Sequence, residues 1–168
     1  MRKVITVLFV TLLFSGMGFA QSNAKIGYID SNKILSEMPE TDSLSKELKN
    51  YADYLDQQMQ TMGQEYQKKV QDYQQNVAGM SDLIRQTKEK EITDLQQRIQ
   101  AFQASADKDL QDKQQELFSP LIQRVKDAIT AVGKENGYNY ILDVGTGAVV
   151  YYEGDDISAL VKKKLGVK

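Results

Sequence analysis

The side chains that most often do chemistry in proteins are missing from this sequence. Its 168 residues include no histidine and no cysteine, so the commonest general base, the commonest metal ligand and the thiolate nucleophile are absent. Serine–lysine, tyrosine or carboxylate catalysis would remain. No GxxxxGK[ST] loop for nucleotide phosphates occurs, and the GTG triplet at 145–147 is typical of a turn. We therefore predict a protein that is not an enzyme, with no catalytic residues and no cofactor.

One acidic group could offer oxygen ligands to calcium. It consists of Glu153, Asp155 and Asp156. A turn with a capping carboxylate explains it more simply, because an apolar helical pattern begins directly afterwards at Ile157. We therefore predict no metal site.

The first twenty residues have the pattern of an export signal. Arg2 and Lys3 precede the apolar run Val4–Phe14. Gly18 and Ala20 then occupy the small positions of a signal-peptidase site. An apolar run of eleven residues is short for a membrane span, which needs about 20, so cleavage after Ala20 is favoured over an uncleaved anchor. Residues 1–20 are predicted to be a signal peptide.

The remaining chain is weakly acidic. Without Arg2 and Lys3 it contains 19 basic and 23 acidic side chains, for a net charge of −4. Proteins that bind nucleic acid have a basic patch or stripe, which this composition does not provide. We expect no nucleic-acid partner.

Apolar side chains follow a long helical pattern from residue 44 onward. Their spacing repeats as 4-3-4 residues, an eleven-residue repeat that gives a nearly straight or slightly right-handed seam. The first series comprises Leu44, Leu48, Tyr51, Leu55, Met59, Met62 and Tyr66, followed by Val70, Tyr73 and Val77. The second begins at Ile84 and includes Leu95, Ile99, Phe102, Leu110 and Leu117, with Lys88, Glu91, Ala106 and Lys113 at the intervening positions.

Gly79 stands between the two series, either as a blemish in one rod or as a turn. Each position in the first series and its counterpart in the second add up to 161, so the pattern is a mirror image. An antiparallel pair requires this symmetry, whereas a single rod does not. Residues 41–117 are therefore predicted to form an antiparallel coiled-coil hairpin with its tip near 78–81. Gly79 would supply a positive φ at the turn, and Ser81 would cap the returning helix.

A few apolar residues lie off this seam. They are Tyr54, Met80, Leu83 and Ile92. Scattered apolar side chains are normal on a surface, but three of these lie near the tip, where methionine and aliphatic groups could contact varied partners. Both interpretations stay open, and these four residues are the candidate binding residues.

Residues 21–40 and 118–168 are predicted to form a small head, split around the hairpin. Strands are expected at 25–30, 138–144 and 148–153, and Ser119–Pro120 is expected to start a new helix. The fold class is thus α+β, mainly α. Three short strands with exposed edges are marginal alone, so we expect the head to oligomerise. The residues assigned to that contact are Ile26, Tyr28, Ile141, Val149, Val150, Tyr151 and Tyr152.

The segments KIGYIDSNKILSEMPE and YNYILDVGTGAVVYYEGDDISALV, at either end of the helical hairpin, resemble the Skp/OmpH family of periplasmic chaperones. The resemblance covers the whole mature chain. It implies a jellyfish-like homotrimer in the periplasm, with three arms around a cavity that holds unfolded outer-membrane proteins without ATP.

The arms depart from the family's pattern in their charge. Members often have strongly basic arms, whereas residues 42–117 contain 10 basic and 14 acidic side chains. We therefore do not expect binding to lipopolysaccharide or anionic lipid. The alternative function is a structural spacer or adaptor of the envelope that docks a folded partner through the tip.

Overall fold

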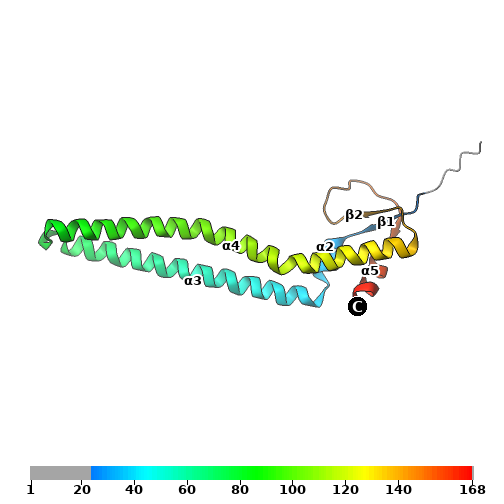
Figure 1. The fold of residues 1–168 in the computed structure, drawn as a ribbon, viewed down its shortest axis with the longest axis horizontal. Helices are drawn as coiled ribbons and strands as arrows, with labels where there is room; N and C mark the ends of the chain where they lie inside the picture. The colour runs from blue at the N-terminus through cyan, green and yellow to red at the C-terminus, as the bar shows by residue number, and fades with distance from the viewer. Residues whose placement is uncertain (1–23, 168) are drawn as a thin grey trace, which may run out of the picture.

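The computed structural model describes residues 24–167, so the predicted signal peptide lies outside the described residues. Two long helices run side by side in opposite directions from a small sheet-containing end (Figure 1). The mainly helical α+β class is confirmed. The elements in order are β1 (Ile26–Ile29), α2 (Ser31–Ser36), α3 (Pro39–Asn76), the 3-10 turn η1 (Val77–Gly79), α4 (Asp82–Asn136), β2 (Tyr140–Asp143), β3 (Asp155–Asp156) and α5 (Ser158–Leu165).

We call α3, the turn at residues 77–81 and the Asp82–Leu117 part of α4 the arm, and the rest of the described chain the head. Within residues 24–167, no helix has both the length and the apolar character needed to cross a bilayer.

Local capping chemistry sets several helix boundaries. The Asp30 carboxylate accepts a hydrogen bond of 3.0 Å from the Lys33 amide and so caps α2. The Ser81 hydroxyl oxygen accepts one of 3.4 Å from the Ile84 amide at the start of α4. Gly137 ends α4 with a φ of 69°, the left-handed conformation that glycine adopts without steric cost.

The tip turn is built differently from the prediction. Gly79 is the last residue of η1, but its φ lies outside the left-handed region. The chain instead reverses through the extended backbones of Met80 (φ −80°, ψ 141°) and Ser81 (φ −67°, ψ 157°). The predicted positive φ at Gly79 was therefore wrong.

The expected helix start at Ser119–Pro120 was also wrong, because α4 continues through Pro120. A proline inside a helix lacks the amide that would bond to the residue four before it, here Glu116, at a cost of about 3 kcal/mol. Leu121, next to the proline, and Val125, about one turn further along, are both buried, and their packing into the head offsets that cost. Figure 1 shows α4 changing direction between arm and head. One continuous helix thus belongs to both parts.

The sheet has the order β2-β1-β3, and both pairings are parallel. Ile26 pairs with Tyr140 in one ladder and Tyr28 with Asp156 in the other. The predicted strand at 148–153 was wrong. The strands that pair with β1 are β2 and β3, and the segment lies in the loop between them, at residues 144–154 (Figure 1). We call this segment the head loop.

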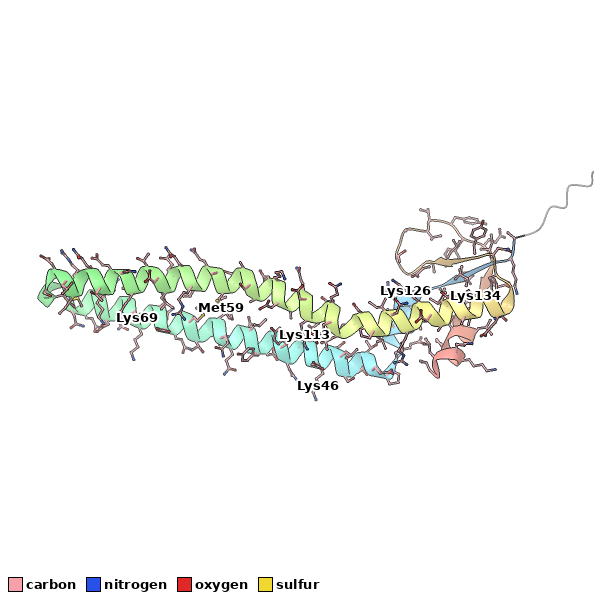
Figure 2. All side chains as sticks on the ribbon, in the orientation of Figure 1. Lys46, Met59, Lys69, Lys113, Lys126 and Lys134 are labelled. Atoms are coloured by element: carbon pink, nitrogen blue, oxygen red, sulfur yellow. The ribbon has the colours of Figure 1, made fainter. Side chains whose placement is uncertain are left out.

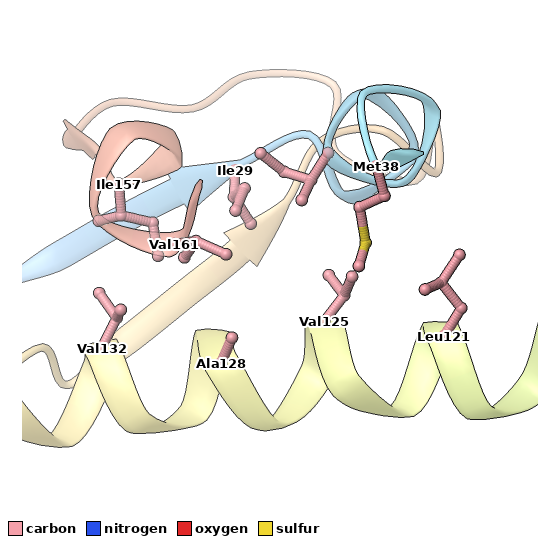
Figure 3. Close-up of a cluster of buried hydrophobic side chains, with 9 residues drawn as sticks. Ile29, Met38, Leu121, Val125, Ala128, Val132, Ile157 and Val161 are labelled. Atoms are coloured by element: carbon pink, nitrogen blue, oxygen red, sulfur yellow. The ribbon is translucent and has the colours of Figure 1, made fainter. Parts of the chain in front are cut away.

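A single apolar cluster holds the head together (Figure 3). Helix α4 contributes Leu121, Val125, Ala128 and Val132, at steps of four, three and four residues. These steps continue the spacing of the arm's apolar positions. The cluster is completed by β1, α2, the start of α5 and the residues beside them, through Ile29, Ile34, Met38, Ile157 and Val161.

Gly79 in the tip turn and Gly137 at the end of α4 give a first test. At Gly79 an added Cβ meets nothing within 4 Å and no left-handed φ opposes it, so Gly79→Ala should stabilise the fold by about 0.5 kcal/mol. At Gly137, with φ 69°, Gly137→Ala should destabilise it by roughly 1–2 kcal/mol. Urea unfolding of the two variants measures both changes. Equal destabilisation by both would contradict the turn geometry.

Candidate functional site

The arm has an apolar seam that is only half covered. All of α3 lies within the described residues, and none of its 38 residues is fully buried. In the part of α4 that faces α3, Leu95 alone among the described residues is buried, at 2% exposed. In a pair of helices, each apolar side chain of the seam is covered by the partner helix on one side only, and its other side stays exposed. The predicted seam residues are half-buried rather than enclosed: Leu44, Leu48, Tyr51, Leu55, Met59, Met62, Tyr66, Ile99, Phe102, Leu110 and Leu117.

Ion pairs between the two helices show how they are aligned. Lys113 lies 3.3 Å from Glu47 near the base of the arm, and Lys69 lies 2.9 Å from Glu91 toward the tip. Lys69 and Lys113 are both labelled in Figure 2. The helices are thus antiparallel, and each contact joins residues at matching distances from the turn.

Toward the tip, polar contacts replace apolar packing across the seam. Besides the Lys69–Glu91 pair, the Tyr73 hydroxyl donates to the Glu89 carboxylate at 2.5 Å, and Lys88 lies 3.4 Å from Asp72. The hydrogen bond from Lys69 lowers the pKa of Glu91, and the same bond raises the pKa of Lys69. Such partly exposed pairs contribute little stability each. We call these six residues the distal polar cluster.

The four candidate binding residues do not form one site. Tyr54 is 55% exposed and stacks on Tyr51 with ring centroids 6.5 Å apart. Met80 and Leu83, at the tip, lie about 38 Å further along the arm at 1.5 Å per residue, whereas Ile92, next to Glu91 and level with Lys69 of α3, lies about 22 Å further along. Leu83 is 75% exposed, while Met80 and Ile92 are half-buried.

Ile84 is an exposed tip residue that the sequence pattern had assigned to the seam. It is 51% exposed and lies next to Leu83 at the start of α4. Its seam counterpart Val77 belongs to the 3-10 turn and not to α3, so no regular helix turn faces it. The position of Ile84 so close to the turn could have indicated, from the sequence alone, that its side chain would be exposed.

The head loop exposes a second group of apolar side chains. Val150 is 98% exposed and Tyr151 78%. Tyr152 packs on Tyr28 of β1 with ring centroids 4.7 Å apart. Among the other residues predicted for oligomerisation, Ile26 is exposed, Val149 is half-buried and Ile141 packs on the core beside Gly133.

The acidic residues after the head loop make structural hydrogen bonds. Asp155 accepts a bond of 2.9 Å from the Tyr138 hydroxyl. Asp156 accepts one of 2.8 Å from the amide of Ser158, the first residue of α5, and its bonds to Ser158 lower its pKa. Across the described residues 24–167, no group of three or more acidic side chains is arranged to hold a metal ion.

The fold defines a class of protein in which a small α+β head carries a long two-helix arm. Comparison with family models identifies the class more closely: the chain belongs to the OmpH-like outer membrane protein family, whose model matches residues 25–165.

Curated relatives match over nearly the whole chain. The chain is similar to the chaperone protein Skp of Pectobacterium atrosepticum, with 24% identity over 98% of this chain and 99% of the relative. The Skp proteins of Photorhabdus luminescens and Yersinia enterocolitica match with the same identity and coverage. The Skp/OmpH family is a family of chaperones and not a class of enzymes.

The distal polar cluster gives a test by pH. The pKa of Glu91 is lowered from its ordinary 4.5, so its pairing with Lys69 stabilises the arm above that pH and is lost as the pH falls through the lowered value. Amide protection of the distal arm, measured by hydrogen exchange and corrected for intrinsic rates, should therefore decrease between pH 6 and about pH 3.

Glu91→Gln should abolish most of this decrease. The matched control is Asp94→Asn, because Asp94 pairs with Lys90 on the same helix and does not join α4 to α3. An unchanged decrease in Glu91→Gln would show that the ion pair does not hold the two helices together.

Proposed function

We propose that this chain is an ATP-independent holdase chaperone of the periplasm, which binds unfolded outer-membrane proteins between its arms and prevents their aggregation. Membership of the Skp/OmpH family and the names of the relatives support this proposal. The observation that carries it is the arm itself. A 38-residue helix without a fully buried residue offers apolar contact along its whole length.

The arm suits a client without fixed structure. Its apolar groups are spread along about 55 Å of helix and are not gathered in one pocket. Tyr54 is far from Leu83 and Ile84 along the arm, and all three are exposed. Each contact is weak, but contacts within an enclosed space add up through effective concentration. Such binding prevents aggregation without requiring a particular client sequence.

We assign residues 41–117 to a coiled-coil hairpin arm and residues 21–40 and 118–168 to the head. The head associates as a homotrimer, so that three arms enclose a cavity. The exposed side chains of the head loop support this assembly, since Val150 and Tyr151 would be covered by neighbouring subunits. Export follows from residues 1–20 acting as a cleaved signal peptide.

The absence of tryptophan from the chain allows a direct test. A urea-unfolded, tryptophan-containing outer-membrane barrel protein is diluted into buffer with increasing amounts of the mature chain, while tryptophan emission and light scattering are followed. We expect saturable binding and suppressed scattering at about one client per oligomer. Unchanged scattering without binding would contradict a holdase and favour the spacer, which would bind a folded partner instead.

The role of the head loop can be tested separately. The double variant Val150→Asp/Tyr151→Asp should weaken assembly by roughly 3 kcal/mol or more, a factor above 100 in the dissociation constant. The control is Thr146→Asp, an exposed polar position in the same loop. Sedimentation velocity over a range of concentrations measures both variants. An oligomer that is unaffected by the double variant would place the interface elsewhere.

A further inference from the structure

A groove lies between the two helices halfway along the arm. Its volume is about 400 Å³, and its apolar walls come from Leu55 and Met59 of α3 and Phe102 and Leu110 of α4. Met59 is labelled in the middle of the arm in Figure 2. The groove exists because two of its lining residues are alanines. Ala106 of α4 stands in the apolar repeat between the larger Phe102 and Leu110, and Ala52 of α3 lines the opposite wall. Two small side chains leave room that larger ones would fill.

The rim of this groove is acidic. Asp56 of α3 and Asp107 of α4 both line it. Both are exposed, and neither takes part in an ion pair within the described part of the chain. The two carboxylates therefore stand free at the edges of an apolar hollow.

The charge of the whole arm is concentrated around the groove. Residues 50–62 and 99–112, which we call the mid-arm segment, contain five acidic side chains and one basic one. The remainder of residues 42–117 contains nine of each sign. The net charge of residues 42–117, which is −4, therefore comes entirely from the mid-arm segment.

We propose that the mid-arm groove is a binding site for cationic, apolar stretches of an unfolded polypeptide. A leucine or aromatic side chain would occupy the hollow, and lysine or arginine side chains flanking it in the client would pair with Asp56 and Asp107. This inference rests on the proposed function, because it takes the client to be an unfolded chain, and it deepens that function by giving the client a preferred composition. Charge complementarity is the reason for this choice of occupant.

Other occupants fit the same surface less well. An anionic lipid surface would be repelled by the acidic mid-arm segment. The same segment of a second copy would bring two clusters of like charge together, which is unfavourable. An uncharged apolar peptide would fill the hollow but leave the rim carboxylates without partners.

The test uses two unstructured twelve-residue peptides, each with one tryptophan, two leucines and three charged residues, which are lysines in one peptide and glutamates in the other. Tryptophan emission and anisotropy report binding to the full oligomer, at low salt and at about 150 mM salt. The lysine peptide should bind at least about fivefold more tightly than the glutamate peptide at low salt, and this preference should decrease with salt.

Two variants locate the site. Ala106→Leu fills the hollow and should weaken the lysine peptide by about fivefold, while Ala104→Leu, on an exposed position two residues away, should not. The double variant Asp56→Asn/Asp107→Asn removes the rim charges and should bring the affinities of the two peptides close to each other. Its control is Glu65→Gln, which removes a charge outside the mid-arm segment and should leave the preference for the lysine peptide unchanged. Circular dichroism verifies that each variant keeps its helix content, and the double variant tests the site even if Ala106→Leu disturbs packing.

Equal binding of the two peptides would overturn the inference, as would equal weakening by Ala106→Leu and Ala104→Leu. A change of oligomer mass in Ala106→Leu would also overturn it, because the groove would then hold another subunit. The aggregation assay with the wild-type chain separates these outcomes from a failure of the proposed function. Suppressed scattering together with equal peptide affinities contradicts this site alone.

Discussion

One apolar stripe along α4 connects the arm to the head. Leu95 and Leu110 on this stripe contact the region of α3, and Leu121 to Val132 enter the head core. Because all of these side chains are on one 55-residue helix, the face turned toward α3 and the face turned toward the core keep a fixed rotational relation. The head therefore sets the direction in which the arm presents its surfaces. Pro120 lies between the two regions, so the helix can change direction without losing this relation.

The half-covered seam reflects a limit on what two helices can bury. A third helix would be needed to enclose the apolar side chains of α3. Without it, one side of these side chains stays exposed along the arm. The same feature that withholds stability from the arm provides apolar surface for a partner. The head compensates through a small, fully buried cluster, in which Ile29, Ile157 and Val161 are 0% exposed. Stability is thus concentrated in the head and binding surface in the arm.

Charge and packing vary along the arm, and the total composition of the arm does not reveal this variation. Near the tip, ion pairs between Lys69 and Glu91 and between Lys88 and Asp72 join the helices. In the middle, small residues open a groove whose rim holds Asp56 and Asp107, two carboxylates that form no ion pair within residues 24–167. A sum over the arm gives a weakly acidic surface, whereas the structure separates a balanced distal region from an acidic central one.

The sequence by itself determined the features that depend on near neighbours along the chain. The cap at Ser81, the mainly helical class and the apolar seam follow from short-range hydrogen bonding and from periodicity. Tertiary structure decided the rest. Pro120 looked like a helix start, but burial of Leu121 and Val125 carried the helix through it. The β-rich run around Val150 forms a loop, and the short segment Asp155–Asp156 pairs with β1 in its place. The groove at Ala106 exists only where α3 and α4 meet, because a hollow depends on side chains from both helices at once.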